Sequence, residues 1–176
     1  IAWYALSDGK TYAYPNYGYS TDDLPEGQGL VPNRCIVVRA DMLEKLGYDT
    51  TTLVDVKADE FLNMCERAVK EIGAYNDLSV IGMQLYEGGS EAADIMSQYL
   101  AMPWETEDGQ YYDTWTSGAN KETYAFLNEA YRRGLILEAN YSDTRDQVRE
   151  KIASGRVFAL IAAPQDFASQ FATLYE

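Results

Sequence analysis

The chain has 176 residues, of which 47% are hydrophobic and 24% are charged, and these are ordinary values for a globular protein that buries a core. Its formal net charge of −14 opposes binding to nucleic acid or anionic lipid, because both need clusters of Lys and Arg. It contains no His, which removes the commonest general base and the commonest metal ligand.

The beginning of the chain is predicted to form a hairpin followed by a long loop. Apolar and aromatic residues flank Asp8-Gly9, a pair favoured in tight turns, so we expect strands at 2–6 and 11–15. Residues 16–32 are rich in Asn, Tyr, Gly, Asp and Pro. This composition indicates a long loop, and such loops often carry binding groups on a rigid scaffold.

A strand and two helices are predicted next. The apolar residues at 34–39 indicate a strand, which leads into a helix at 40–46 that ends at Gly47. Apolar residues recur with a 3.6-residue period over 58–72, which predicts an amphipathic helix ended by Gly73.

The middle of the chain is predicted to hold a short strand, a helix and a small hairpin. The strand covers 79–84. Gly88-Gly89-Ser90 opens the helix, with Ser90 as its cap, and Pro103-Trp104 ends it. Asp108-Gly109 then favours a hairpin between two short extended pieces.

Two helices and a buried strand are predicted for the last third. The first helix, at 119–133, carries Tyr124, Phe126, Leu127, Ala130 and Tyr131 on its apolar stripe. Thr144-x-x-Gln147 matches a capping box for a helix at 145–154. Residues 156–162 are almost wholly apolar, the pattern of a strand buried on both faces. A last helix begins near Pro164.

The two cysteines, Cys35 and Cys65, each lie on an apolar element, and we interpret them as buried free thiols. A disulfide between them is the alternative, since the sequence does not supply the distance between the two thiols. No apolar run approaches the ~18 residues of a membrane span. The chain begins at Ile1 without a signal peptide, and we expect it to lie inside a longer protein.

Several short motifs follow one another along the chain in a recognisable order. They are Asp8-Gly9-Lys10, the R-x-D-x-L-x-K-L-G pattern at 39–47, Asp59-Glu60-Phe61, the helix segment 124–136, and Asp146-Gln147-Val148-Arg149 with Ser154-Gly155. In this order they resemble the family-1 extracellular solute-binding proteins, the sugar-capturing receptors of ABC importers. Two departures from the family pattern are Ala13 in place of Gly, and Leu137-Glu138-Ala139 where Asp-Pro is usual.

The resemblance implies an α/β fold: a helix-rich lobe of the periplasmic-binding-protein-like (type II) kind, with a small mixed sheet flanked by about six helices. It also implies a domain plan. Residues 1–15 would be the hinge and hairpin that enter the lobe, 16–161 the second lobe, and 162–176 the hinge that begins the return to a first lobe. That first lobe is largely absent from this sequence.

A sugar presents flat C–H faces ringed by hydroxyls, so aromatic rings and directional polar groups are the side chains expected to bind it. By resemblance, the loop after the hairpin and the start of the third strand face the cleft between lobes, Trp104 matches an aromatic residue of the family, and the junction that opens the last helix presents groups to the ligand. Gly89 precedes a helix, whose N-terminus offers unpaired backbone amides. We therefore predict a ligand site at Tyr17, Tyr19, Asn33, Arg34, Gly89, Trp104, Gln165 and Asp166. The alternative to ligand binding is a structural role, in which the tyrosines pack the loop onto the domain and Gly89 belongs to an ordinary capped helix start.

The resemblance implies capture of a mono- or oligosaccharide for an ABC permease by hinge closure of two lobes. We expect an extracellular, lipid-anchored or periplasmic monomer whose signal and anchor lie outside this sequence. We expect no catalytic residue, metal or cofactor, and no nucleic-acid partner. The acidic segment with Glu105, Glu107, Asp108 and Asp113 is interpreted as a solvated hairpin. Two alternatives stay open: a secreted glycoside hydrolase and an adhesive surface module.

Overall fold

The computed structural model describes residues 8–10, 34–100, 105, 108–110 and 120–174. The chain divides into two compact units, Ile1–Pro32 and Asn33–Glu176. In the first unit, the backbone N–H of Lys10 donates to Oδ1 of Asp8 at 2.9 Å and Gly9 has a φ of 76°. The predicted turn is therefore present. The predicted strands at 2–6 and 11–15, and the loop at 16–32, lie outside the described residues.

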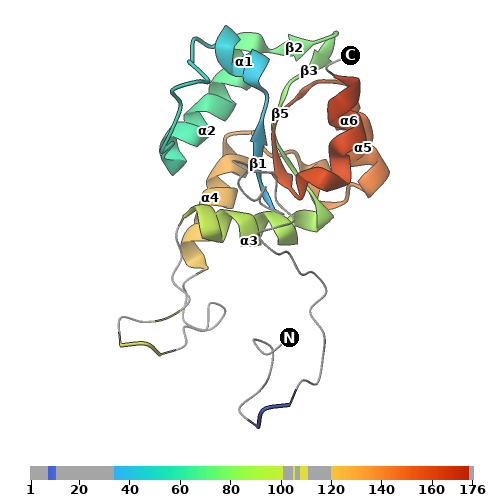
Figure 1. Cartoon of the computed structure of the whole chain (residues 1–176). Helices are drawn as coiled ribbons and strands as arrows, with labels where there is room; N and C mark the ends of the chain where they lie inside the picture. The colour runs from blue at the N-terminus through green and yellow to red at the C-terminus, as the bar shows by residue number, and fades with distance from the viewer. Residues whose placement is uncertain (1–7, 11–33, 101–104, 106–107, 111–119, 175–176) are drawn as a thin grey trace. The chain divides into compact units, whose positions relative to one another are not determined.

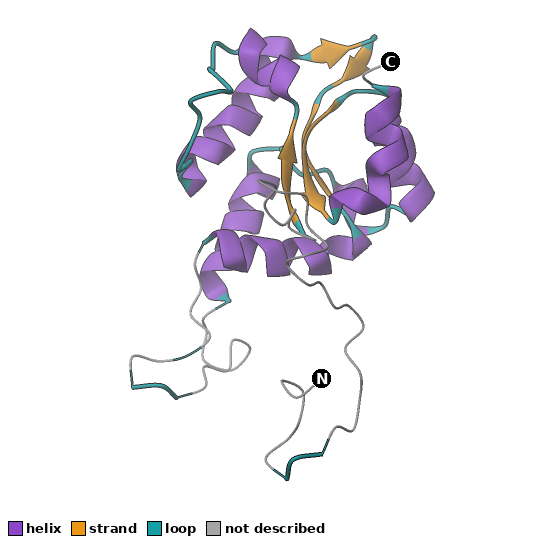
Figure 2. Cartoon of the chain, in the orientation of Figure 1, coloured by secondary structure: helices purple, strands orange, loops and turns teal. Residues whose placement is uncertain are grey.

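A three-stranded mixed sheet organises the second unit (Figures 1 and 2). Its strands are β1 (Cys35–Val38), β4 (Ile81–Leu85) and β5 (Val157–Ala162), in the order β1-β5-β4. Strand β5 lies in the centre, parallel to β4 and antiparallel to β1. Every residue of β4 and β5 is buried, and for β5 the continuous apolar run at 156–162 predicted this.

Helices cover both faces of this sheet. The larger apolar cluster draws on α1 (Ala40–Lys45), α2 (Ala58–Arg67), α3 (Ser90–Tyr99) and α4 (Lys121–Arg132). A second cluster lies on the opposite face, where Figure 1 shows the final helices, and draws on α5 (Arg145–Ala153) and the 3₁₀ turn η6 (Pro164–Phe167), with α6 (Ala168–Thr173) packed against α5. The described part is thus α/β with six α-helices and a small mixed sheet, as predicted.

Two helix ends form as the sequence predicted. Helix α1 ends in a Schellman motif: the N–H groups of Gly47 and Tyr48 donate to the carbonyls of Glu44 and Leu43, and Gly47 has a φ of 85°. Helix α5 begins with a capping box, in which Thr144 and Gln147 each donate a backbone N–H to the other's side chain.

Other details of the helix predictions were wrong. The helix predicted at 58–72 changes at Ala68 into a π-helical turn, η3 (Ala68–Ile72), before it ends at Gly73. The N-cap of α3 is Gly89, so Ser90 is the first helical residue and not the cap. The apolar stripe predicted for 119–133 buries Phe126, Leu127 and Ala130 but leaves Tyr124 and Tyr131 exposed.

The sequence did not reveal a small hairpin between η3 and β4. Strands β2 (Ala74–Tyr75) and β3 (Leu78–Ser79) pair across Asn76 and Asp77, which both have positive φ. This is the geometry of a tight two-residue turn, which Asn and Asp tolerate better than most residues. The hairpin takes up Ser79, so the strand predicted at 79–84 begins at Ile81.

Candidate functional site

One edge of the sheet gathers most of the predicted site segments. Because β4 and β5 are parallel, their carboxyl ends meet at one edge, and the antiparallel β1 begins there, with Cys35 opposite Ala162. Arg34 precedes β1, Gly88-Gly89 follows β4, and Gln165-Asp166 follows β5. Three segments far apart in sequence therefore share an edge, which is where open α/β sheets bind ligands.

The two loops that follow the parallel strands are tied together by an aromatic contact. Tyr86, directly after β4, meets Phe167, at the end of η6, in an edge-to-face arrangement with ring centroids 5.4 Å apart. Both residues are buried. This contact fixes the loops relative to each other, so their exposed residues are presented by a rigid support.

Gly88 and Gly89 form the turn between β4 and α3. Their φ angles are 64° and 89°, a left-handed conformation that only glycine adopts without strain. A side chain at Gly89 would meet Leu85 and Tyr141. The sequence predicted a ligand-facing amide at Gly89, and the structure places this glycine in the wall of a cavity.

Arg34 forms ion pairs with α3. Its guanidinium lies 3.3 Å from Oε1 of Glu91 and 3.2 Å from Oδ2 of Asp94. The Arg34 side chain is 45% exposed, whereas that of Glu91 is 9% exposed. Arg34 thus ties the start of β1 to α3 while part of its side chain stays exposed.

The segment after β5 is also held in place, through an ion pair between Asp166 and Arg145. Oδ1 of Asp166 accepts a hydrogen bond of 2.7 Å from Arg145, the first residue of α5. Gln165, beside it in η6, is exposed. The other predicted site residues, Tyr17, Tyr19, Asn33 and Trp104, lie outside the described residues.

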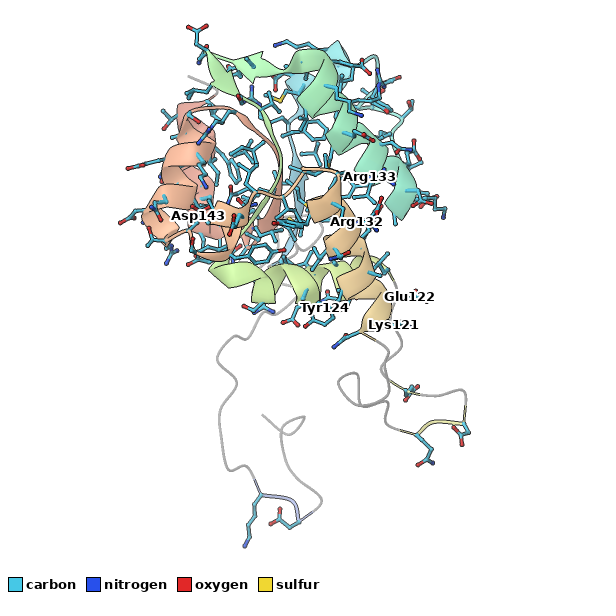
Figure 3. All side chains as sticks on the ribbon, turned by 180° about the vertical axis from the view of Figure 1, so that it is seen from behind. Lys121, Glu122, Tyr124, Arg132, Arg133 and Asp143 are labelled. Atoms are coloured by element: carbon cyan, nitrogen blue, oxygen red, sulfur yellow. The ribbon has the colours of Figure 1, made fainter. Side chains whose placement is uncertain are left out.

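A cavity of about 470 Å³ opens beside this edge, and we call it the tyrosine cavity. Such a volume lies within the range of small-molecule sites. Tyr124, near the start of α4, lies beside α3 in Figure 3. The lining residues are Leu85, Gly88, Gly89, Ser90, Ala93, Tyr124, Leu127, Asn128, Tyr131 and Tyr141.

The three tyrosines of this cavity are between 44% and 49% exposed. Tyr131 and Tyr141 meet edge to face, with ring centroids 6.3 Å apart. Among the lining residues that the structure describes, Gly89 alone was predicted as a site residue. The three tyrosines were not predicted as site residues, because Tyr124 and Tyr131 belong to the pattern that predicted the helix at 119–133. Tyr141 lies in η5 (Glu138–Tyr141), a turn that the sequence did not predict.

Buried polar groups hold η5, and with it Tyr141, against β4. Asn140 is fully buried and donates through Nδ2 to the carbonyl of Met83 at 2.9 Å. Gln84, also fully buried, donates to Oδ2 of Asp143 at 3.1 Å. Asp143 in turn forms an ion pair with Lys151 of α5, and both side chains are largely shielded from water. These buried interactions with β4 therefore hold the turn that carries Tyr141 in place.

A second cavity, of about 350 Å³, lies between β1, α2 and α3, and we call it the β1 cavity. Its walls are mostly apolar. They are formed by Arg34, Cys35, Ile36, Val38, Leu43, Leu53, Val56, Phe61, Met64, Ile95, Gln98 and Tyr99. The hydroxyl of Tyr99 donates to the carbonyl of Val56 at 2.5 Å, and burial raises the pKa of Tyr99.

Both cysteines are free thiols, as the sequence predicted. Cys35 is half-buried in the wall of the β1 cavity, and Cys65 is fully buried in the core. Burial raises the pKa of each thiol above its ordinary value. Neither microenvironment is that of an activated nucleophile, which needs a lowered pKa.

Two kinds of functional feature are absent from the described residues, a metal-ligating cluster and a membrane-spanning helix. The residues from 34 to 100 and from 120 to 174, with the short described pieces at 8–10, 105 and 108–110, contain no cluster of three or more metal-ligating side chains. In the same residues every helix is too short or too polar to span a bilayer. Of the segment predicted as an acidic hairpin, the structure describes residues 105 and 108–110, and Gly109 has a φ of 78°.

None of the known protein-family models matches this chain, and neither does any curated protein. Two solved structures share its fold. One is a sugar transporter from Arthrobacter chlorophenolicus A6 with bound laminaribiose, at 19% sequence identity and a TM-score of 0.55. The other is a sugar transporter from Bacillus licheniformis in complex with stachyose, at 16% identity and a TM-score of 0.53.

The alignments cover most of this chain but a minor part of the transporters. They include 77% and 82% of this chain, and 33% and 37% of the two transporter chains. This chain therefore spans about a third of their length. At these identities the likeness defines a shared fold over about a third of each transporter chain.

Proposed function

We propose that this chain is one lobe of an extracellular solute-binding protein that captures a mono- or oligosaccharide for an ABC importer. In this proposal the lobe has the type II periplasmic-binding-protein fold and belongs to a family-1 protein. The main observation in its support is the convergence of Arg34, Gly88-Gly89 and Gln165-Asp166 at one edge of the sheet. The folds and bound sugars of the two transporters agree with it.

The proposed mechanism is closure of two lobes around the sugar. This lobe contributes one wall of the site, made by rigid loops at the carboxyl ends of β4 and β5. A second lobe contributes the opposite wall, and the hinge segments are 1–15 and 162–176. Sugar bound between the walls stabilises the closed form, which docks on the permease. The protein acts outside the cytoplasm as a monomer, held by a lipid anchor or free in a periplasm.

The two-lobe protein that this proposal requires should bind a neutral oligosaccharide tightly, whereas this lobe alone should bind weakly or not at all. Calorimetric titration of both proteins with laminaribiose and stachyose tests the affinities. Small-angle scattering tests the mechanism, because closure lowers the radius of gyration when the sugar is added. Tight binding by the lobe alone, or an unchanged radius in the saturated two-lobe protein, would contradict hinge closure.

The variant Arg34→Met tests the edge directly. It keeps much of the aliphatic stem but removes the guanidinium that lies beside Glu91 and Asp94. We expect at least a several-fold loss of sugar affinity in the two-lobe protein, with the fold retained by circular dichroism. Arg67→Met is the matched control, because Arg67 also pairs with an acidic residue, Glu71, but lies on α2. Release of nitrophenol from aryl-glycosides would favour a glycoside hydrolase instead.

A further inference from the structure

We propose that the tyrosine cavity is a stacking subsite for one pyranose ring of a neutral saccharide. The inference rests on the proposed function for its ligand class, and it adds residues that the edge alone does not include. The added residues are Tyr124, Asn128 and Tyr131 of α4 and Tyr141 of η5.

The first argument is the exposure of the rings. Tyrosine side chains that only fill a core are mostly buried, yet Tyr124, Tyr131 and Tyr141 are 46%, 44% and 49% exposed around one cavity. Leu85 and Leu127 are buried beneath them and provide an apolar floor. An aromatic wall over an apolar floor is the surface that the C–H face of a sugar ring covers.

The described lining of the tyrosine cavity is uncharged, which favours a neutral ligand. The chain has a net charge of −14, and 24% of its residues are charged. Nevertheless, the lining of this cavity, as far as the described residues form it, contains no Asp, Glu, Lys or Arg. A charged ligand would enter such a site without a partner and lose hydration. A neutral ligand avoids that cost, so the lining selects an uncharged saccharide over a uronic acid or an amino sugar.

The third argument is the supply of directional polar groups at the rim. The lining includes three tyrosines, Asn128 and Gly88-Gly89, which carry phenol hydroxyls, a carboxamide and backbone amides. These groups include both donors and acceptors, as sugar hydroxyls require. Gly89 has no side chain, and a methyl group there would lie in van der Waals contact with Leu85 at 3.5 Å and with Tyr141 at 3.7 Å, so it would occupy part of this wall.

The fourth argument is that the cavity is already formed. Tyr141 is carried by η5, which Asn140 attaches to Met83 of β4 and which ends beside the buried Asp143–Lys151 ion pair. Tyr124 and Tyr131 project from α4, whose buried face packs in the core. A rigid wall loses little conformational entropy when the ligand binds, so stacking contributes directly to affinity.

The test uses the chain itself with maltose, cellobiose and lactose as neutral probes and glucuronic acid as the charged comparison. Ligand-detected saturation-transfer NMR measures binding at millimolar affinity. We expect weak binding of at least one disaccharide and about tenfold weaker binding of glucuronic acid. Tyr141→Ala and Tyr131→Ala should each weaken disaccharide binding about tenfold, while Tyr141→Phe, which keeps the ring and removes only the hydroxyl, should weaken it by a smaller factor.

Tyr48→Ala is the matched control, because Tyr48 is a partly exposed tyrosine that packs against Arg67 and lies outside the cavity. Circular dichroism checks the fold of each variant. Unchanged binding in both alanine variants, or no binding by the chain to any of the neutral probes, overturns the inference. Neither result touches the proposed function, which fails separately if the two-lobe protein binds no sugar.

Discussion

The tyrosine cavity and the β1 cavity border the same helix, α3, and have comparable volumes of about 470 and 350 Å³. They differ in what lines them. Four residues of the β1 cavity, Leu43, Phe61, Met64 and Ile95, are buried members of the main core. The tyrosine cavity instead has three half-exposed rings at its rim. Volume alone therefore does not distinguish a ligand site from the margin of a hydrophobic core.

The difference has an energetic meaning. Side chains around the β1 cavity stabilise the fold, because their removal exposes or empties part of the core. The tyrosines of the other cavity bury only part of their surface, so the folded state depends on them less. Residues whose loss costs little stability but much affinity are those that serve a ligand. Substitutions around the two cavities can therefore be compared by their separate effects on the free energy of unfolding and on saccharide affinity.

The largest expected effect is on stability, at Phe61. This residue is 4% exposed, meets Tyr99 edge to face and stacks on Phe126, with ring centroids 6.1 and 6.4 Å away. We expect Phe61→Ala to lower the free energy of unfolding by about 3–5 kcal/mol. Tyr141→Ala should lower it by about 1 kcal/mol or less, because half of that side chain is already in water.

Urea denaturation of both variants at one temperature measures this contrast. Equal losses of unfolding free energy would break the comparison, since Tyr141 would then be a core residue like Phe61. A clear difference would instead make Tyr141→Ala a safe variant for binding studies, because the variant remains folded.

A smaller loss of unfolding free energy is expected when Gly89 or Gly47 is replaced by alanine. Gly89 and Gly47 have nearly equal φ angles of 89° and 85°, so alanine at either position costs about 1 kcal/mol of backbone strain. A methyl group at Gly47 meets nothing within 4 Å, whereas at Gly89 it enters the tyrosine cavity. Both variants should lose similar unfolding free energy, but only Gly89→Ala should lose saccharide affinity.

Thermal unfolding of the two variants measures their stability, and saccharide titration measures their affinity. Gly47→Ala is the strain control, because it changes the backbone preference without changing either cavity. If Gly89→Ala binds saccharide as well as Gly47→Ala does, the wall at Gly89 does not face the ligand.

Much of the scaffold was predictable because its signals are local. The αL position at Gly47, the capping box of Thr144 and Gln147, and the apolar run of β5 each depend on a few neighbouring residues. Arg34, Gly89, Gln165 and Asp166, which were predicted as site residues, lie at one edge of the sheet, and their role in ligand binding stays a prediction. Their common position came from the resemblance to a family and not from spacing.

The tyrosine cavity was not predictable, for a physical reason. Tyrosine has an apolar body and a polar tip, so helical periodicity alone cannot tell a core position from a rim position. Tyr124 and Tyr131 flank the buried stripe of α4, and only its packing against α3 decides that they stay exposed. Tyr141 depends on long-range contacts of Asn140 and Asp143 with β4, which leave no local pattern.

The smallest expected effect is at Cys35, which reports on the β1 cavity. Burial raises the pKa of its thiol, so the reactive thiolate is scarce at neutral pH and alkylation should be slow, becoming faster as the pH rises. If the saccharide occupies the tyrosine cavity, a saturating neutral disaccharide should leave the alkylation rate at Cys35 unchanged. Iodoacetamide labelling followed by mass spectrometry measures this rate, with the fully buried Cys65 as an unreactive internal reference. Protection of Cys35 by the sugar would place the ligand in the β1 cavity and reverse the roles assigned to the two cavities.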